Sequence, residues 1–150
     1  MPAGTTPIFP ATPLVANCSL IAASAGTSRA PTAYASMGST PIFAVELVPS
    51  QTNGCRIDMI QCKMGATAIG GASTAGTIII WLVNNSGSGY PIDEILVTVV
   101  TPSASVASYL GQKYFTNLIV PTGYSIWVST TIVGAAAAHA PVCTAFGGAY

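Results

Sequence analysis

Short runs of apolar, β-branched and aromatic residues follow one another along the chain, with turn-forming residues between them. In one such run Tyr124, Ile126 and Val128 occupy every second position, which is the period of a strand with one buried face. The positions between them are polar apart from Trp127. Eight segments are strand-like: 18–24, 42–48, 55–64, 77–84, 92–100, 109–118, 124–132 and 141–146. No segment keeps the apolar period of a helix over the roughly 10–12 residues that a helix prediction needs.

Turn-forming residues set the spacing of these segments. Glycine, asparagine, serine and proline gather at 52–54, 85–89, 101–103 and 121–123, and such clusters are typical of turns and loops. Short strands at this spacing are typical of an all-β sandwich or barrel. We predict an antiparallel two-sheet β-sandwich, jelly-roll-like, with about eight strands and an extended N-terminal arm.

Two of the predicted strands depart from simple alternation. Segment 77–83 is apolar on both faces, so we expect a central strand beneath a covering loop or a strand buried by another subunit. Core filling is the default role of Trp81 in this segment, and a subunit contact is the alternative. In segment 56–64 the apolar phase inverts, and a β-bulge near Met59 and Ile60 would produce that inversion.

The first residues are punctuated by prolines, and we divide the chain into an extended arm (1–16) and a β-sandwich domain (17–150). Each proline removes a backbone donor and biases the preceding residue towards extended geometry, so the arm is neither a helix nor a mid-sheet strand. Two interpretations stay open, a frayed terminus and a segment that docks on a neighbouring subunit. The second makes candidate contacts of Pro7, Ile8, Phe9, Pro10 and Pro13.

Charged residues make up 5% of the 150 residues, and four Lys plus Arg balance four Asp plus Glu. Soluble domains average about 25% charged residues. The hydrophobic fraction of 51% excludes intrinsic disorder, and four scattered cations exclude a nucleic-acid partner bound through its phosphates. A surface so poor in charge suits a protein whose neighbours cover it. The composition therefore predicts a component of a permanent assembly.

The apolar runs are too short for a membrane. The longest, 78–83, falls far short of the roughly 20 residues that a spanning helix needs. The first charged residue is Arg29, which does not fit the basic start of a secretory signal. We therefore expect no membrane partner and no signal peptide.

The four cysteines, at positions 18, 55, 62 and 143, lack the short spacing of a zinc site. Cys55 and Cys62 are seven positions apart and would point to opposite faces of an unbroken strand. The sequence favours buried free thiols in a reducing compartment, with disulfide bonding as the alternative.

No catalytic constellation is recognisable. His139 is the single histidine and lies in an alanine-rich loop. Asp93 and Glu94 are adjacent, so they would point to opposite faces of a strand and could not converge on one substrate. Phosphate-loop, dinucleotide and metal motifs are absent from the sequence. We predict a protein that is not an enzyme and that binds no cofactor or metal.

Aromatic side chains are the remaining candidates for a binding site. Exposed indoles and phenols bind sugar faces and also anchor protein interfaces. This makes Trp127, Tyr90 or Tyr124 a candidate sugar platform. For Trp127 an interface anchor and a packed sheet edge stay open as alternatives.

Several segments from about residue 52 onward resemble small virion proteins of tailed bacteriophages. They are TNG at 52–54, TAGTIIIWL at 74–82, IDEILV at 92–97, TPSASV at 101–106, LIVPTGYSI at 118–126 and FGGAY at 146–150. The resemblance implies a decoration (cement) protein with a β-sandwich fold, often a homotrimer, that clamps capsomers from outside. It also implies the major capsid protein as partner and a place on the capsid surface of the virion, after synthesis in the host cytoplasm.

We therefore expect a structural virion protein that stabilises capsomer junctions. Trp81 and Trp127 are its candidate contacts within the sandwich, beside those of the arm. The alternative is a jelly-roll carbohydrate- or receptor-binding module of a virion.

Overall fold

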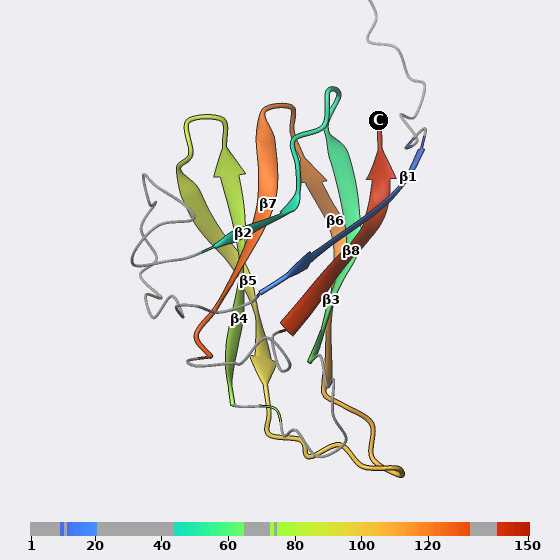
Figure 1. Ribbon diagram of the computed structural model, residues 1–150. Coiled ribbons are helices and arrows are strands. Elements are labelled where there is room, and N and C mark those ends of the chain that lie inside the picture. Colours follow the sequence, from blue (N-terminus) through green and yellow to red (C-terminus); the bar gives the residue numbers. More distant parts are fainter. Residues whose placement is uncertain (1–9, 11, 21–43, 65–72, 74, 133–140) are drawn as a thin grey trace, which may run out of the picture.

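The computed structural model describes residues 10, 12–20, 44–64, 73, 75–132 and 141–150. The eight strands are β1 (Thr12–Ser19), β2 (Val45–Val48), β3 (Cys55–Met64), β4 (Gly76–Asn84), β5 (Gly89–Val97), β6 (Leu110–Val120), β7 (Tyr124–Thr130) and β8 (Pro141–Ala149). They form two four-stranded sheets, in the orders β1-β8-β3-β6 and β2-β7-β4-β5, which lie face to face (Figure 1). All neighbouring strands are antiparallel, and none of the described residues is helical.

The order of the strands defines the topology. Every connection passes from one sheet to the other except that between β4 and β5, which are hydrogen-bonded neighbours. Two sheets of this kind with eight strands form a jelly roll. The predicted antiparallel two-sheet β-sandwich is confirmed.

Apart from the first strand, the strands lie where the sequence pattern predicts them, although β5 is displaced towards the N-terminus, at Gly89–Val97 instead of 92–100, and β8 extends to Ala149 instead of ending at residue 146. The predicted segment 55–64 coincides with β3, and the tight turns at 54, 87 and 123 each carry a glycine with φ between 81° and 83°. The predicted strand 18–24 instead begins at Thr12 and ends at Ser19. The boundary drawn after residue 16 therefore falls inside β1, whose Pro13 is tolerated because β1 is an edge strand.

A bulge interrupts β3 close to the predicted place. The register of β3 shifts between Ile57 and Met59 against both of its neighbours. Ile57 and Ile60 are consequently both buried, although three positions separate them. On β8, a Cβ at Gly147 would clash with the carbonyl oxygen of Arg56, so only glycine lets the strands approach this closely at the bulge.

The main core lies between the two sheets, and β4 is buried on both sides. Ile78 and Ile80 face this core, whereas Ile79, Trp81 and Val83 belong to a second cluster with Ala44. All five β4 side chains are at most 2% exposed within the single chain. The prediction of a central strand without a wet side is confirmed, and its burial needs no second subunit.

An ion pair joins the two sheets at the side of the sandwich where β5 and β6 meet. The Lys113 Nζ of β6 lies 2.8 Å from the Asp93 Oδ1 of β5. Nearby, the Tyr109 hydroxyl donates a hydrogen bond to the carbonyl oxygen of Leu96. Asp93 therefore works as a partner of Lys113, and its neighbour Glu94 is exposed to solvent.

Candidate functional site

The structure places the predicted contact residues in different environments. Pro10 is half-buried and Pro13 is exposed on β1. Trp81 is fully buried, so it presents no surface to a partner, while Trp127 is half-buried beside it. Three of the predicted contacts, Pro7, Ile8 and Phe9, lie outside the described residues, as does His139.

The two tryptophans are register partners on β4 and β7, on the side of their sheet that faces away from the main core. The indole N–H of Trp81 donates to the Ser129 Oγ at 2.8 Å, and that of Trp127 donates to the Ser125 Oγ at 2.9 Å. Both polar groups are thus satisfied inside the chain. Trp81 fills a core, and Trp127 packs at its margin.

The three aromatic residues of the predicted sugar platform do not share a face. Tyr90 pairs with Leu82, which packs against the main core, and Tyr124 packs against that core as well. Trp127 lies on the opposite side of the same sheet. A flat ligand such as a sugar ring could not contact all three at once.

A row of apolar side chains with exposed ends crosses the outward side of β1-β8-β3-β6. Val15 pairs with Phe146, Phe146 with Met59, and Met59 with Tyr114, so these four side chains form one row across the sheet. Val15 is 64% and Tyr114 is 68% exposed, and the two between them are half-buried. We call these four residues the outer row.

The surroundings of the outer row are nearly free of unpaired charge. The adjacent row across the sheet is polar and neutral: Asn17, Thr144, Gln61 and Gln112. Beyond the row's other side, the Arg56 Nε lies 2.7 Å from the Asp58 Oδ1, so these two charges largely compensate each other. The exposed Lys63 lies one row beyond the polar row. Removing the outer row and the polar row from water would therefore bury apolar and neutral groups at little electrostatic cost.

The outer row is the feature that sequence reasoning missed. Each strand contributes a single residue to it, and no segment of the sequence contains two of them. The sequence indicates which residues of each strand point outward. Which of these residues lie side by side depends on the strand order and register, and no single segment contains that information.

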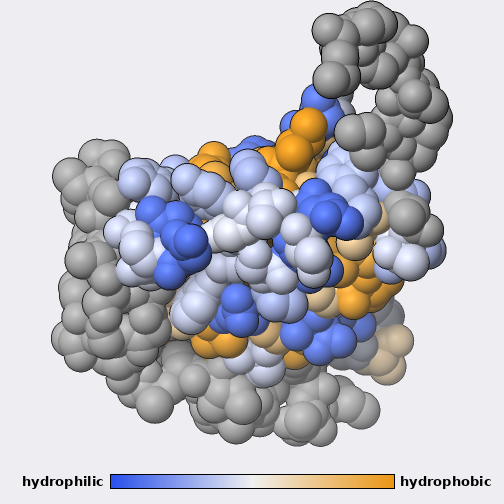
Figure 2. Space-filling view, turned by 90° about the horizontal axis from the view of Figure 1, so that it is seen from above, coloured by the Kyte–Doolittle hydropathy of each residue, from blue (hydrophilic) through white to orange (hydrophobic). Residues whose placement is uncertain are grey.

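The end of the sandwich that holds the turns differs from this face. Seen from above in Figure 2, most described residues are hydrophilic or near neutral, and hydrophobic ones show only in separate small areas. The C-terminus is fixed there, because Tyr150 N–H donates to the Gly54 carbonyl at 3.2 Å and Asn53 Nδ2 donates to the Tyr150 oxygen at 3.3 Å. An open groove of about 670 Å³ is lined there by Asn53, Ile119, Val120, Pro121 and Tyr150. These described lining residues include no acid–base pair.

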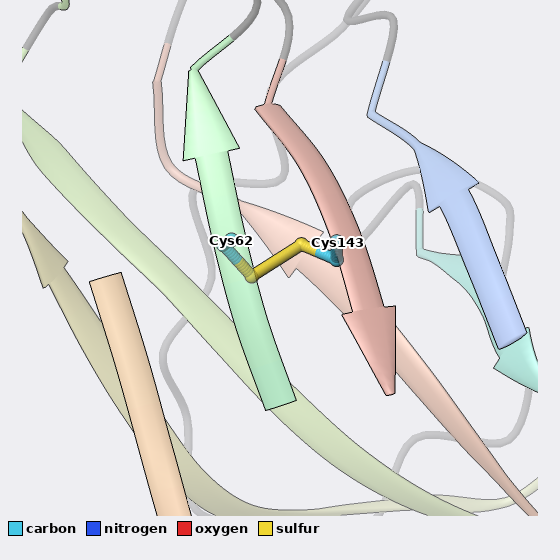
Figure 3. Close-up of a disulfide and its surroundings, with 2 residues drawn as sticks. All are labelled: Cys62 and Cys143. Atoms are coloured by element: carbon cyan, nitrogen blue, oxygen red, sulfur yellow. A yellow bond between two sulfur atoms is a disulfide. The ribbon is translucent and has the colours of Figure 1, made fainter. Parts of the chain in front are cut away.

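Two cysteines are joined, which corrects the prediction of free thiols. Cys62 of β3 and Cys143 of β8 form a disulfide with their Cα atoms 4.1 Å apart (Figure 3). The sequence could not indicate it, because the partners are 81 positions apart and meet only through the strand pairing. Cys18 and Cys55 are free, and burial raises the pKa of both thiols, that of Cys18 to about 11.

Two further features were sought in the described residues, a cluster of metal-ligating side chains and a helix that could cross a bilayer. Among those residues, no three His, Cys, Asp or Glu side chains are close enough together to hold a metal ion. No helix in this part is long and apolar enough to span a bilayer.

The fold and the surface together define an eight-stranded jelly-roll β-sandwich with an apolar row across one outward sheet face. No family model matches the chain, and no curated protein matches it either. Among solved structures it is similar to one described as "Structure of infectious bursal disease virus Gx strain", at 11% identity and a TM-score of 0.29. The match covers all of this chain but only 42% of that one, and at this TM-score it carries no argument.

Proposed function

We propose that the protein is a structural component of a virion, of the cement or decoration type. In this proposal it forms a homotrimer on the outside of a phage capsid, contacts the major capsid protein and stabilises capsomer junctions. Its role is mechanical rather than catalytic. The phage assignment rests on the sequence resemblance described above.

The outer row is the observation that carries the proposal. Val15, Phe146, Met59 and Tyr114 form a continuous apolar row that is partly exposed. Such rows mark interaction sites, and this chain has few charged residues that would oppose association through the row. A neighbouring virion protein that covers this face would remove apolar area from water without stranding a charge. We assign the outer row to the contact with the capsid shell.

The fold is compatible with this role. Eight-stranded double-sheet jelly rolls serve as viral capsid domains, but they also serve as lectins and cupins. For the carbohydrate-binding alternative, Tyr90 and Trp127 lie on two sides of the sheet, so these two side chains offer no joint platform to one ligand. We therefore favour the structural role.

Binding to capsid shells tests the proposal. Shells assembled from the major capsid protein of a tailed phage that encodes this chain would be incubated with the protein and sedimented. Tyr114→Glu places a charge in the outer row at a position that is 68% exposed, so it should leave the fold intact. We expect at least a roughly tenfold loss of bound protein, because the contact would then bury an unpaired carboxylate.

Leu96→Glu is the matched control. Leu96 is 69% exposed, but it lies on β5 in the other sheet. We expect it to bind shells like the wild type. Equal binding by Tyr114→Glu and the wild type would reject the outer row as the contact. A monomer by light scattering at micromolar concentration would reject the trimer.

A further inference from the structure

Three of the four cysteines lie in one row across β1, β8 and β3. Cys143 pairs in register with Cys62 on one side and with Cys18 on the other. Cross-strand partners place their side chains on the same face, and all three contact the core between the sheets. In Figure 3 the strand of Cys143 lies between β3 and the blue β1, with the disulfide on its β3 side. Cys143 therefore has a cysteine neighbour on each side.

The two pairs differ in their backbone geometry. The Cα separation of 4.1 Å between Cys62 and Cys143 is that of a non-hydrogen-bonded pair. The N–H and C=O of Cys143 then point towards β1, which makes Cys18 and Cys143 a hydrogen-bonded pair. The hydrogen bond from Leu20 N–H to the Pro141 carbonyl oxygen, 2.8 Å long, supports this assignment. Leu20 and Pro141 lie two positions from Cys18 and Cys143, and hydrogen-bonded pairs recur at every second position. Such pairs have Cα atoms about 5.5 Å apart, within the roughly 4.4–6.8 Å that disulfides span.

We propose that Cys143 is the shared partner of a thiol–disulfide exchange site. The sulfur of Cys18 attacks the Cys143 Sγ, a Cys18–Cys143 disulfide forms, and the Cys62–Cys143 bond breaks. The proton that leaves Cys18 is replaced by one that the Cys62 sulfur takes up from solvent. One disulfide replaces another, so the step consumes no external oxidant or reductant.

The exchange changes which strands are covalently joined. The disulfide between Cys62 and Cys143 ties β3 to β8, two interior strands. The disulfide between Cys18 and Cys143 would tie the edge strand β1 to β8. β1 carries Val15 of the outer row and, as an edge strand, has a hydrogen-bonded neighbour on one side only, so it frays more easily than the interior strands β8 and β3. The site thus controls how firmly this edge of the outward face is held.

The surroundings of Cys18 set a slow exchange rate at neutral pH. The attacking species is the thiolate, and burial keeps the Cys18 thiol protonated by raising its pKa. β1 is an edge strand, so it can move slightly towards β8 and bring the sulfur atoms of Cys18 and Cys143 within bonding distance. The Cys62–Cys143 bond present in the structure is the starting state, and raised pH accelerates the exchange.

Disulfide mapping of the oxidised wild-type protein tests the proposal. The folded protein is held at about pH 9, where more thiolate is present, then quenched with acid, alkylated and digested for mass spectrometry. We expect a Cys18–Cys143 peptide and an alkylated Cys62. Cys18→Ser removes the attacking sulfur, and we expect alkylation of Cys62 to fall by at least about tenfold in that variant.

Cys55→Ser is the matched control, because Cys55 is a buried free thiol whose partner on β8 is Ala149 rather than a cysteine. It should leave the exchange unchanged. A wild-type map in which Cys18 and Cys55 are the sole alkylated cysteines at every time point would overturn the proposal.

Cys62→Ser gives a second, independent test. Oxidised with glutathione disulfide, and with its β-structure checked by circular dichroism, this variant should form the Cys18–Cys143 bond. Cys143 found bound to glutathione, or joined to Cys55, would count against the site. Should this variant fail to fold, the map of the wild type decides.

Discussion

The outward sides of both sheets carry apolar side chains, but those of β4 are covered by the chain itself, whereas those at the ends of the outer row are exposed. On β4, Ile79, Trp81 and Val83 are at most 2% exposed, and the indole N–H of Trp81 has a partner inside the molecule. On the other sheet, Val15 and Tyr114 are 64% and 68% exposed. In a chain with so few charges, apolar residues can therefore indicate either a core or an exposed surface, and their arrangement along the sequence distinguishes the two. A continuous apolar strand marks a core, whereas single apolar residues from four strands mark an open surface.

The largest expected effect is a difference in the free energy of unfolding between a variant on the covered side of β4 and a variant in the outer row. Trp81→Ala removes a fully buried indole from the covered side, and we expect it to lower the free energy of unfolding by about 3–5 kcal/mol. Tyr114→Ala acts on the open side and should change the free energy of unfolding by no more than about 0.5 kcal/mol. Chemical denaturation of both variants measures the difference. Equal losses in the two variants would show that the outer row belongs to the folding core.

Periodicity sufficed to predict much of the fold. β3 lies at the predicted positions. Its bulge lies between Ile57 and Met59, next to the predicted place at Met59 and Ile60, because the inversion of the hydrophobic phase is visible in the sequence. The start of β1 was wrong because its prolines favoured an arm, whereas an edge strand accommodates Pro13. Local signals thus located strands but not their places in a sheet.

The candidate surfaces were less predictable because they depend on register between distant segments. Trp81 was proposed as a contact from the apolar character of its strand, and its complete burial depends on what covers that strand. The disulfide and the outer row both join residues from β3 and β8, which lie far apart in the sequence. No spacing rule within one segment reports such pairs.

A smaller effect sharpens the comparison within the covered side. Ser129 accepts the hydrogen bond of the buried Trp81, and Ser125 accepts that of the half-buried Trp127. Ser129→Ala should lower the free energy of unfolding by about 1–3 kcal/mol, since water cannot replace the lost acceptor. Ser125→Ala should cost about 0.5–1 kcal/mol, because Trp127 is closer to solvent. Urea denaturation of the two variants measures both losses. A larger loss for Ser125→Ala than for Ser129→Ala would contradict the assignment of Trp81 as the more deeply buried tryptophan.

The smallest effect concerns charge. Lys113 and Asp93 join the two sheets at one side of the sandwich, but their side chains are 40% and 26% exposed, so solvent screens the pair. Asp93→Asn should lower the free energy of unfolding by less than about 1 kcal/mol, and the loss should shrink at about 1 M salt. A loss larger than about 2 kcal/mol that persists in salt would mean that an ion pair closes the sandwich. The expected small loss would instead leave apolar burial, between the sheets and on the covered side, as the main source of the fold's stability.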